Sequence, residues 1–173
     1  MKKKILGIIA TLFALVMLAT PVMAKTKTAV YVVQAGTADM YSGEKYVNTP
    51  NGRMNLVWGL DGAGAVTMYE EDQITIIDTF ASSSVIDAKA KDSTTYGFMD
   101  GVLTWHIKML WESNTHEDSG FEGVMHWRAI DGLTNAEFSA VYQGFGYYKG
   151  QTLKLSGTFV PMVGQVYTGI LIS

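Results

Sequence analysis

The chain has 173 residues, of which 48% are apolar and 17% are charged, and it contains 18 glycines, three prolines and no cysteine. This length fits one domain, and the composition excludes disordered and collagen-like chains. The lack of cysteine excludes disulfides, thiolate metal sites and cysteine nucleophiles. The formal net charge is −3, and the charges are scattered. We therefore expect no nucleic-acid partner, which would require a basic stripe.

Residues 1–24 have the pattern of a secretory signal peptide. Three consecutive lysines follow the first methionine, an apolar run covers residues 5–20, and the segment ends at Ala24. A basic start, a short apolar core and a small terminal residue predict export with cleavage after Ala24. An uncleaved anchor is the alternative, but the run is shorter than the roughly 20 residues of a spanning helix. We expect a secreted or periplasmic domain over residues 25–173 that meets a membrane only during export.

The rest of the chain alternates apolar and polar residues with a period of two and shows no sustained helical period. Ten segments predict strands, namely Ala29–Gln34, Met54–Leu60, Ala65–Tyr69, Gln73–Phe80, Thr95–Met99, Val102–Glu112, Phe121–Ile130, Ala136–Tyr142, Thr152–Phe159 and Gln165–Ile172. Tight turns are predicted at Asn51-Gly52, Asp61-Gly62, Asp100-Gly101 and Asp131-Gly132. Short strands with regular turns predict an all-β fold, a single antiparallel up-and-down β-barrel of about eight strands, with a β-sandwich as the alternative.

Turns at Asp100-Gly101 and Asp131-Gly132, with a loop over Asn114–Asp118, place the central strands in a defined register. The expected opposed pairs are Tyr96–Trp105, Trp105–Trp127, Ile107–Met125, Trp111–Phe121, Met125–Phe138 and Phe121–Tyr142. All three connections put aromatic residues on one face, and a slip of one residue would scatter them. We expect that face to be the core or the lining of a pocket.

The opposite face of these strands is polar, and we expect it to be solvated. It carries Thr104, His106, Lys108, Glu112, Glu122, His126, Arg128, Glu137 and Ser139.

Three residues of this polar face form a candidate metal site. The register sets His106 opposite His126, with Glu137 beside His126 on the next strand. Directly opposed β-carbons lie about 4.5–5.5 Å apart, so two imidazoles and a carboxylate could hold zinc or copper. The alternative, which we favour, is three polar residues on a wet surface. We accordingly expect no cofactor.

The aromatic face is the second candidate site. A barrel of about eight strands is just wide enough either to fill itself with side chains or to hold one small ligand. Plain core packing is the alternative to a cavity lined by the four tryptophans and neighbouring tyrosines. The candidate ligand-binding residues are Tyr96, Trp105, Trp111, Trp127, Phe138 and Tyr142.

A glycine-spaced run lies in the last third of the chain, where Gly144, Gly146, Tyr148 and Gly150 form the pattern G-x-G-x-aromatic-x-G and Gly157 follows. The run resembles a hairpin of the allene oxide cyclase and dirigent superfamily of small secreted barrels. This resemblance implies an up-and-down barrel of about eight strands with an apolar interior. It transfers no catalytic residue, because no catalytic position of that family matches a residue here.

The favoured function is therefore a secreted binding module that takes a small apolar or aromatic ligand into its aromatic interior. A structural or surface protein with a filled core is the next alternative, followed by a cofactor-independent barrel isomerase or cyclase. An outer-membrane barrel is the last, because the polar face is heavily charged for a narrow lumen. No catalytic residue is predicted, and no oligomeric state is indicated.

Overall fold

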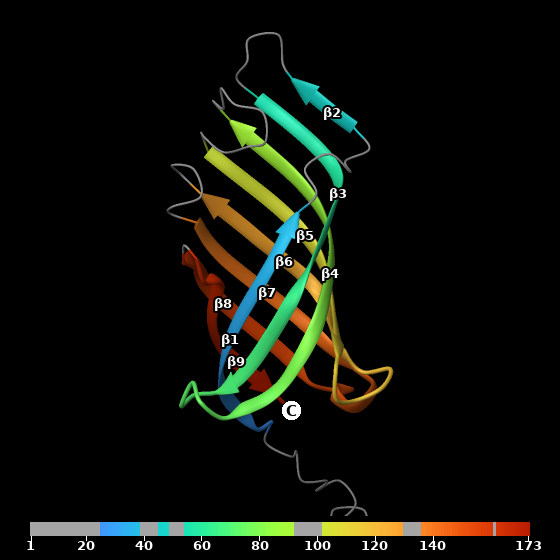
Figure 1. Ribbon diagram of the computed structural model, residues 1–173, viewed down its shortest axis with the longest axis vertical. Coiled ribbons are helices and arrows are strands. Elements are labelled where there is room, and N and C mark those ends of the chain that lie inside the picture. Colours follow the sequence, from blue (N-terminus) through green and yellow to red (C-terminus); the bar gives the residue numbers. More distant parts are fainter. Residues whose placement is uncertain (1–24, 39–44, 49–53, 92–101, 130–135, 161) are drawn as a thin grey trace, which may run out of the picture.

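The computed structural model describes residues 25–38, 45–48, 54–91, 102–129, 136–160 and 162–173 (Figure 1). In this part of the chain lie one short 3₁₀-helix, η1 (Gly146–Tyr148), and nine strands, β1 (Lys27–Ala38), β2 (Lys45–Asn48), β3 (Met54–Glu70), β4 (Ile76–Lys91), β5 (Val102–Ser113), β6 (Gly120–Ala129), β7 (Ala136–Phe145), β8 (Thr152–Val160) and β9 (Gly164–Ile172). Among the described residues, no helix is long and apolar enough to cross a membrane.

The strands form one closed antiparallel barrel of eight strands, which confirms the predicted fold. Their order is β1-β9-β8-β7-β6-β5-β4-β3, and pairing of β1 with β3 from Val30–Glu70 to Ala38–Gly62 closes the ring. The short β2 pairs with the first part of β3, at the upper end of the barrel as drawn in Figure 1. At this upper end β4 ends and β5 begins; the turn between β3 and β4 lies at the lower end.

The pairing is strongly staggered around the ring. A row of opposed residues that leaves β4 at Ala88 returns to β4 at Asp78, ten residues away, after passing Trp105, Trp127, Phe138, Gly157, Tyr167, Val32 and Met68. Such a stagger requires strands tilted to the barrel axis, and eight tilted strands leave an interior that side chains can fill or that can hold one small ligand.

The prediction of two strands separated by a turn at Asp61-Gly62 is wrong, because residues 54–70 form the single strand β3. The irregularity lies just before that dipeptide, where the register with β4 shifts between Val57 and Leu60. Gly59 has a φ of 70°, and its backbone N–H donates to Asp87 Oδ1 of β4 at 3.1 Å. The chain thus makes a bulge and continues, because both Asp61 and Gly62 stay paired with β4.

Five other predicted strands lie within β1, β5, β7, β8 and β9, and Phe121–Ile130 matches β6 up to Ala129. Gln73–Phe80 starts too early, since residues 71–75 form the turn before β4, which then runs on to Lys91. Outside the described residues lie Thr95–Met99 and the turns at Asn51-Gly52, Asp100-Gly101 and Asp131-Gly132.

The predicted register between β5 and β6 is confirmed: Trp105 lies opposite Trp127, Ile107 opposite Met125 and Trp111 opposite Phe121. The predicted Tyr96–Trp105 pair is wrong, because the residue opposite Trp105 on its other side is Ala88 of β4.

The register between β6 and β7 differs from the prediction by two residues. Phe138 lies opposite Trp127 rather than Met125, and Gly144 rather than Tyr142 lies opposite Phe121. The pairing of the described strands carries this result, since residues 130–135 between them lie outside the described part of the chain. Because the shift is even, every side chain keeps its face, and the predicted aromatic face does form one side of the barrel wall, turned inward.

Glycine makes room for the aromatic rings inside the barrel. Gly123 on β6 lies opposite Tyr142 on β7. A Cβ at Gly123 would lie 2.2 Å from the carbonyl oxygen of Val141 and 2.7 Å from Cδ1 of the Tyr142 ring. The buried Tyr142 ring therefore depends on the missing side chain at Gly123.

We expect Gly123→Ala to lower the free energy of unfolding by about 1–3 kcal/mol, because the new methyl group overpacks a filled interior. Urea denaturation followed by circular dichroism measures this loss. Ser139→Ala, on the exposed face of β7, is the control and should change stability by less than about 0.5 kcal/mol. Equal stability of the two variants would contradict the close contact described.

Candidate functional site

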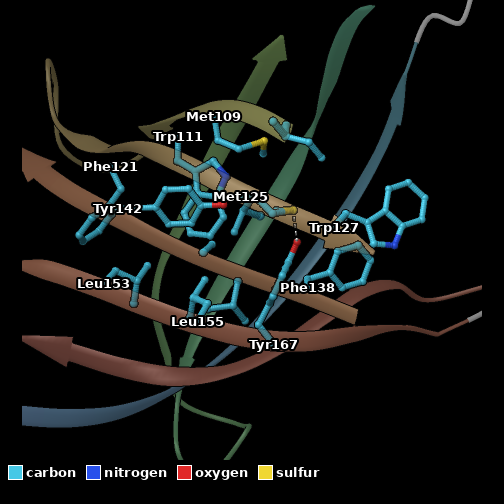
Figure 2. Close-up of a cluster of buried hydrophobic side chains, with 14 of the residues drawn as sticks. Met109, Trp111, Phe121, Met125, Trp127, Phe138, Tyr142, Leu153, Leu155 and Tyr167 are labelled. Atoms are coloured by element: carbon cyan, nitrogen blue, oxygen red, sulfur yellow. Dashed lines mark hydrogen bonds between the residues drawn. The ribbon is translucent and has the colours of Figure 1, made fainter. Parts of the chain in front are cut away.

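The lower half of the barrel interior is filled by aromatic rings. Trp111 and Tyr142 have ring centroids 4.6 Å apart, and those of Phe121 and Tyr148 are 4.7 Å apart. Phe80 lies about 6 Å from three of these rings. We call these five residues the lower aromatic cluster. Figure 2 shows Trp111, Phe121 and Tyr142 together on one side of Met125, with Trp127 and Phe138 on the other.

A buried carboxylate forms the floor beneath this cluster. Asp78 of β4 is 2% exposed. It accepts four hydrogen bonds, from Ser113 Oγ (2.5 Å), Thr115 Oγ1 (2.6 Å), Tyr148 Oη (2.7 Å) and the backbone N–H of Thr79 (2.7 Å). One side chain thereby joins β4 to the end of β5, to the loop after β5 and to η1.

The charge state of Asp78 follows from these bonds. Burial by itself would raise the pKa of the Asp78 carboxyl, but the four hydrogen bonds outweigh it and hold this pKa below its ordinary value. Burial raises the pKa of Tyr148, and its hydrogen bond to Asp78 raises it further. The carboxylate is therefore ionised and the phenol protonated at neutral pH, so Tyr148 donates the bond.

The upper half of the interior contains a cavity of about 220 Å³. One wall of it is apolar and comes from β4 to β8. Trp105 and Trp127 cross nearly at right angles with ring centroids 3.9 Å apart, and Trp127 stacks on Phe138 at 5.5 Å. The other residues of this apolar wall are Ile86, Ile107, Met109, Met125 and Phe159.

The facing wall of the cavity is polar and comes from β9, β1, β3 and β4. Gln34 and Ser82 are buried, and Gln165 and Ser84 are partly exposed. We call these four residues the polar wall. Gly36, Thr37 and Ala63 also line the cavity. Among the described residues that line the cavity, none is charged and none is a histidine.

Tyr167 of β9 joins the two walls. Its hydroxyl contacts the Oε1 atoms of Gln34 (3.3 Å) and Gln165, and it lies 3.7 Å from Sδ of Met125, the contact drawn as a dashed line in Figure 2. Burial raises the pKa of Tyr167 well above its ordinary value, and Tyr142 raises it further. The hydroxyl therefore stays protonated across the physiological range.

The predicted ligand-binding residues are divided between the two halves. Trp105, Trp127 and Phe138 line the cavity. Trp111 and Tyr142 belong to the lower aromatic cluster, away from the cavity lining. Tyr96 lies outside the described residues. The fourth tryptophan, Trp58, is 38% exposed on β3 and does not line the cavity.

The polar wall is not among the residues predicted from the sequence. The signal was present in β1, where Val30, Val32 and Gln34 occupy alternate positions of one strand and are all buried. A glutamine in phase with inward valines indicates a polar group inside the barrel. Finding which strand faces it needs the closure of the sheet.

The predicted metal site is only partly assembled. His106 and His126 lie opposite each other with ring centroids 5.1 Å apart. The placement of Glu137 beside His126 is wrong: the two-residue shift sets Ser139 opposite His126 and Glu137 opposite Arg128. In the described part of the chain, no group of three histidine or acidic side chains is arranged to hold a metal ion.

Comparison of the chain with protein-family models, curated proteins and solved structures finds no match. The hairpin from β7 through η1 to β8 contains the glycine-spaced run, and its resemblance to allene oxide cyclase and dirigent barrels stays a prediction.

The Asp78 network predicts a pH-dependent stability difference. Because the folded-state pKa of Asp78 is lowered, its ionised form stabilises the fold above about pH 4, and this stabilisation is lost as pH falls through the folded-state pKa. We expect Asp78→Asn to lower the free energy of unfolding by about 1–3 kcal/mol at pH 7.

Urea denaturation from pH 7 to pH 3 measures how this difference shrinks. Glu137→Gln, on the exposed face of β7, controls for the loss of one carboxylate. A difference that is constant over the whole pH range would show that the charge of Asp78 does not act as described.

Proposed function

We propose that this protein is an exported binding module that holds one small, ring-containing molecule in the upper half of its barrel. The observation that carries the proposal is the contrast between the halves. Aromatic rings fill the lower half, whereas the upper half keeps a cavity of about 220 Å³ against Trp105, Trp127 and Phe138. A barrel with only a structural role gains stability from a filled interior, so an open upper half supports binding.

The size of the cavity limits the ligand. An apolar cavity of about 150 Å³ in another protein binds benzene. A cavity of about 220 Å³ accordingly fits one ring or two fused rings with a small substituent. The crossed indoles of Trp105 and Trp127 and the stacked ring of Phe138 offer flat apolar surfaces, on which such rings pack by stacked or edge-on contacts.

Binding is better supported than catalysis. The described lining residues include no acid or base that titrates near neutral pH, and general acid–base catalysis needs one within hydrogen-bond reach of the substrate. Tyr167, whose hydroxyl contacts two glutamines of the lining, has a raised pKa, so its phenol stays protonated and does not act as a base. An isomerase or cyclase would need further groups at the cavity.

Export is part of the proposal and rests on the signal-peptide pattern of residues 1–24, which lie outside the described residues. The mass of the protein recovered from its natural source tests it. Cleavage after Ala24 gives a chain that starts at Lys25, and a full-length mass would contradict processing there.

Ligand binding is tested by filling the cavity. We expect 2-acetylnaphthalene to quench tryptophan fluorescence with a dissociation constant of about 1–100 μM, from typical binding energies per ligand atom. Ser84→Leu places a larger side chain in the cavity lining and should weaken binding at least about tenfold. The matched control is Ser83→Leu, because Ser83 is the next residue of β4 and is exposed.

The quenching should also disappear when Trp105 and Trp127 are both replaced by Phe, and it should persist in Trp58→Phe. Native mass spectrometry of protein from its natural source provides a second measurement, since a retained molecule would identify the ligand directly. Equal quenching of the Ser84→Leu and Ser83→Leu variants would place the probe outside the barrel and contradict the proposal.

A further inference from the structure

Two glutamines of the polar wall compete for one hydroxyl hydrogen. Gln34 and Gln165 lie directly opposite each other on β1 and β9, and both meet the hydroxyl of Tyr167 through an amide oxygen. A protonated phenol has one hydrogen to donate and can donate it fully to one oxygen. The two amides therefore cannot both be satisfied as acceptors of the same hydroxyl.

Reversing one amide resolves the conflict, because the oxygen and nitrogen of a glutamine amide exchange places at little cost in shape. One glutamine then accepts the Tyr167 hydrogen through its oxygen, and the other donates an N–H to the Tyr167 oxygen. The first glutamine keeps both of its N–H groups, and the second keeps one N–H and its oxygen. The amide pair then has three unpaired N–H groups and three unused oxygen lone pairs, so it offers hydrogen-bond donors without an excess of them.

From these unpaired N–H groups, and from two indole N–H groups of the lining that also lack acceptors, we propose that the ligand is an uncharged ring compound bearing a carbonyl-type oxygen. That oxygen accepts hydrogen bonds from Gln34 and Gln165 while the rings lie on Trp105, Trp127 and Phe138. The inference rests on the proposed function and names the chemical class that the same cavity selects.

The absence of charge in the described cavity lining determines the charge of the ligand. A carboxylate would lose its hydration without meeting a cationic partner, which is costly in a buried site. A plain hydrocarbon would cover the amides and leave their N–H groups without acceptors, and a site built from hydrogen-bonding groups discriminates against such an analogue. A neutral carbonyl compound meets both requirements.

The indoles of Trp105 and Trp127 add two donors and no acceptor. The Nε1 atoms of Trp105 and Trp127 are buried and have no hydrogen-bond acceptor among the described residues. Ring packing alone therefore fixes these two side chains. A reorientation of either ring towards a bound oxygen would gain a hydrogen bond that the free protein lacks.

Three matched probes test the inference: 2-acetylnaphthalene (neutral, with a carbonyl), 2-ethylnaphthalene (the same shape without an oxygen) and 2-naphthoate (an anion). Isothermal titration calorimetry at pH 7 gives the three affinities. We expect the ketone to bind at least about tenfold more tightly than either of the others, the ratio expected from one satisfied hydrogen bond.

Variants of the polar wall identify the groups responsible. Gln34→Leu and Gln165→Leu keep the side chain about the same size and should each reduce the preference for the ketone over the hydrocarbon to within about threefold. Gln143→Leu, which replaces an exposed glutamine of β7, should leave the preference unchanged. Circular dichroism and thermal unfolding establish that each variant folds; because Gln165 is partly exposed, its variant provides the test if Gln34→Leu fails to fold.

The outcomes separate the inference from the proposed function. If 2-ethylnaphthalene binds as tightly as the ketone, the binding function stands and the carbonyl inference is overturned. If 2-naphthoate binds most tightly, the requirement for a neutral ligand is overturned. If none of the three probes binds, the proposed function itself fails, and the inference fails with it.

Discussion

Closure of the sheet by pairing β1 with β3 is the constraint on which the rest of the structure depends. The pairing from Val30–Glu70 to Ala38–Gly62 turns a row of antiparallel neighbours into a ring, and the ring returns to β4 ten residues away from its start. Because of this stagger, Ala88 of β4 lies beside Trp105 in the upper half, whereas Asp78 of the same strand lies below the lower aromatic cluster. It also places Gln34 of β1 across the interior from strands that it never pairs with.

The lower half of the barrel stabilises the fold, and the upper half contains the proposed binding cavity. In the lower half, aromatic rings pack against one another above a carboxylate that holds β4, the loop after β5 and η1 together. A fully hydrogen-bonded buried charge of this kind fixes local geometry strongly, because any displacement leaves polar groups unpaired in a low-dielectric interior. The upper half can then remain open, since the packing that holds the barrel in shape lies elsewhere.

A polar wall inside an apolar barrel lowers the stability of the fold. The proposed ligand selectivity gives a reason for such a wall. Side chains such as Gln34 and Ser82 lose hydration on burial, whereas valine or leucine at these positions would fill the cavity favourably. Tyr167 recovers part of the loss by contacting both glutamines. The N–H groups that remain unpaired make the wall complementary to an acceptor oxygen, so the same groups that weaken the core define what the cavity selects.

The sequence by itself determined the all-β class, most strands and the inward face of β5, β6 and β7, because a period of two fixes which side of a strand each residue occupies. It also gave the Trp105–Trp127 and His106–His126 pairs across a short loop. An error of two residues between β6 and β7 kept the aromatic face intact and displaced Glu137 from His126, because faces depend on parity and contacts depend on exact register. Only the tertiary structure decided that Asp61-Gly62 stays in one strand, that Trp111 and Trp127 belong to different halves and that Gln34 meets Gln165. The course of β3 and the Gln34–Gln165 pair depend on pairing between strands far apart in the chain, and the two halves differ in how side chains fill them; local alternation encodes neither.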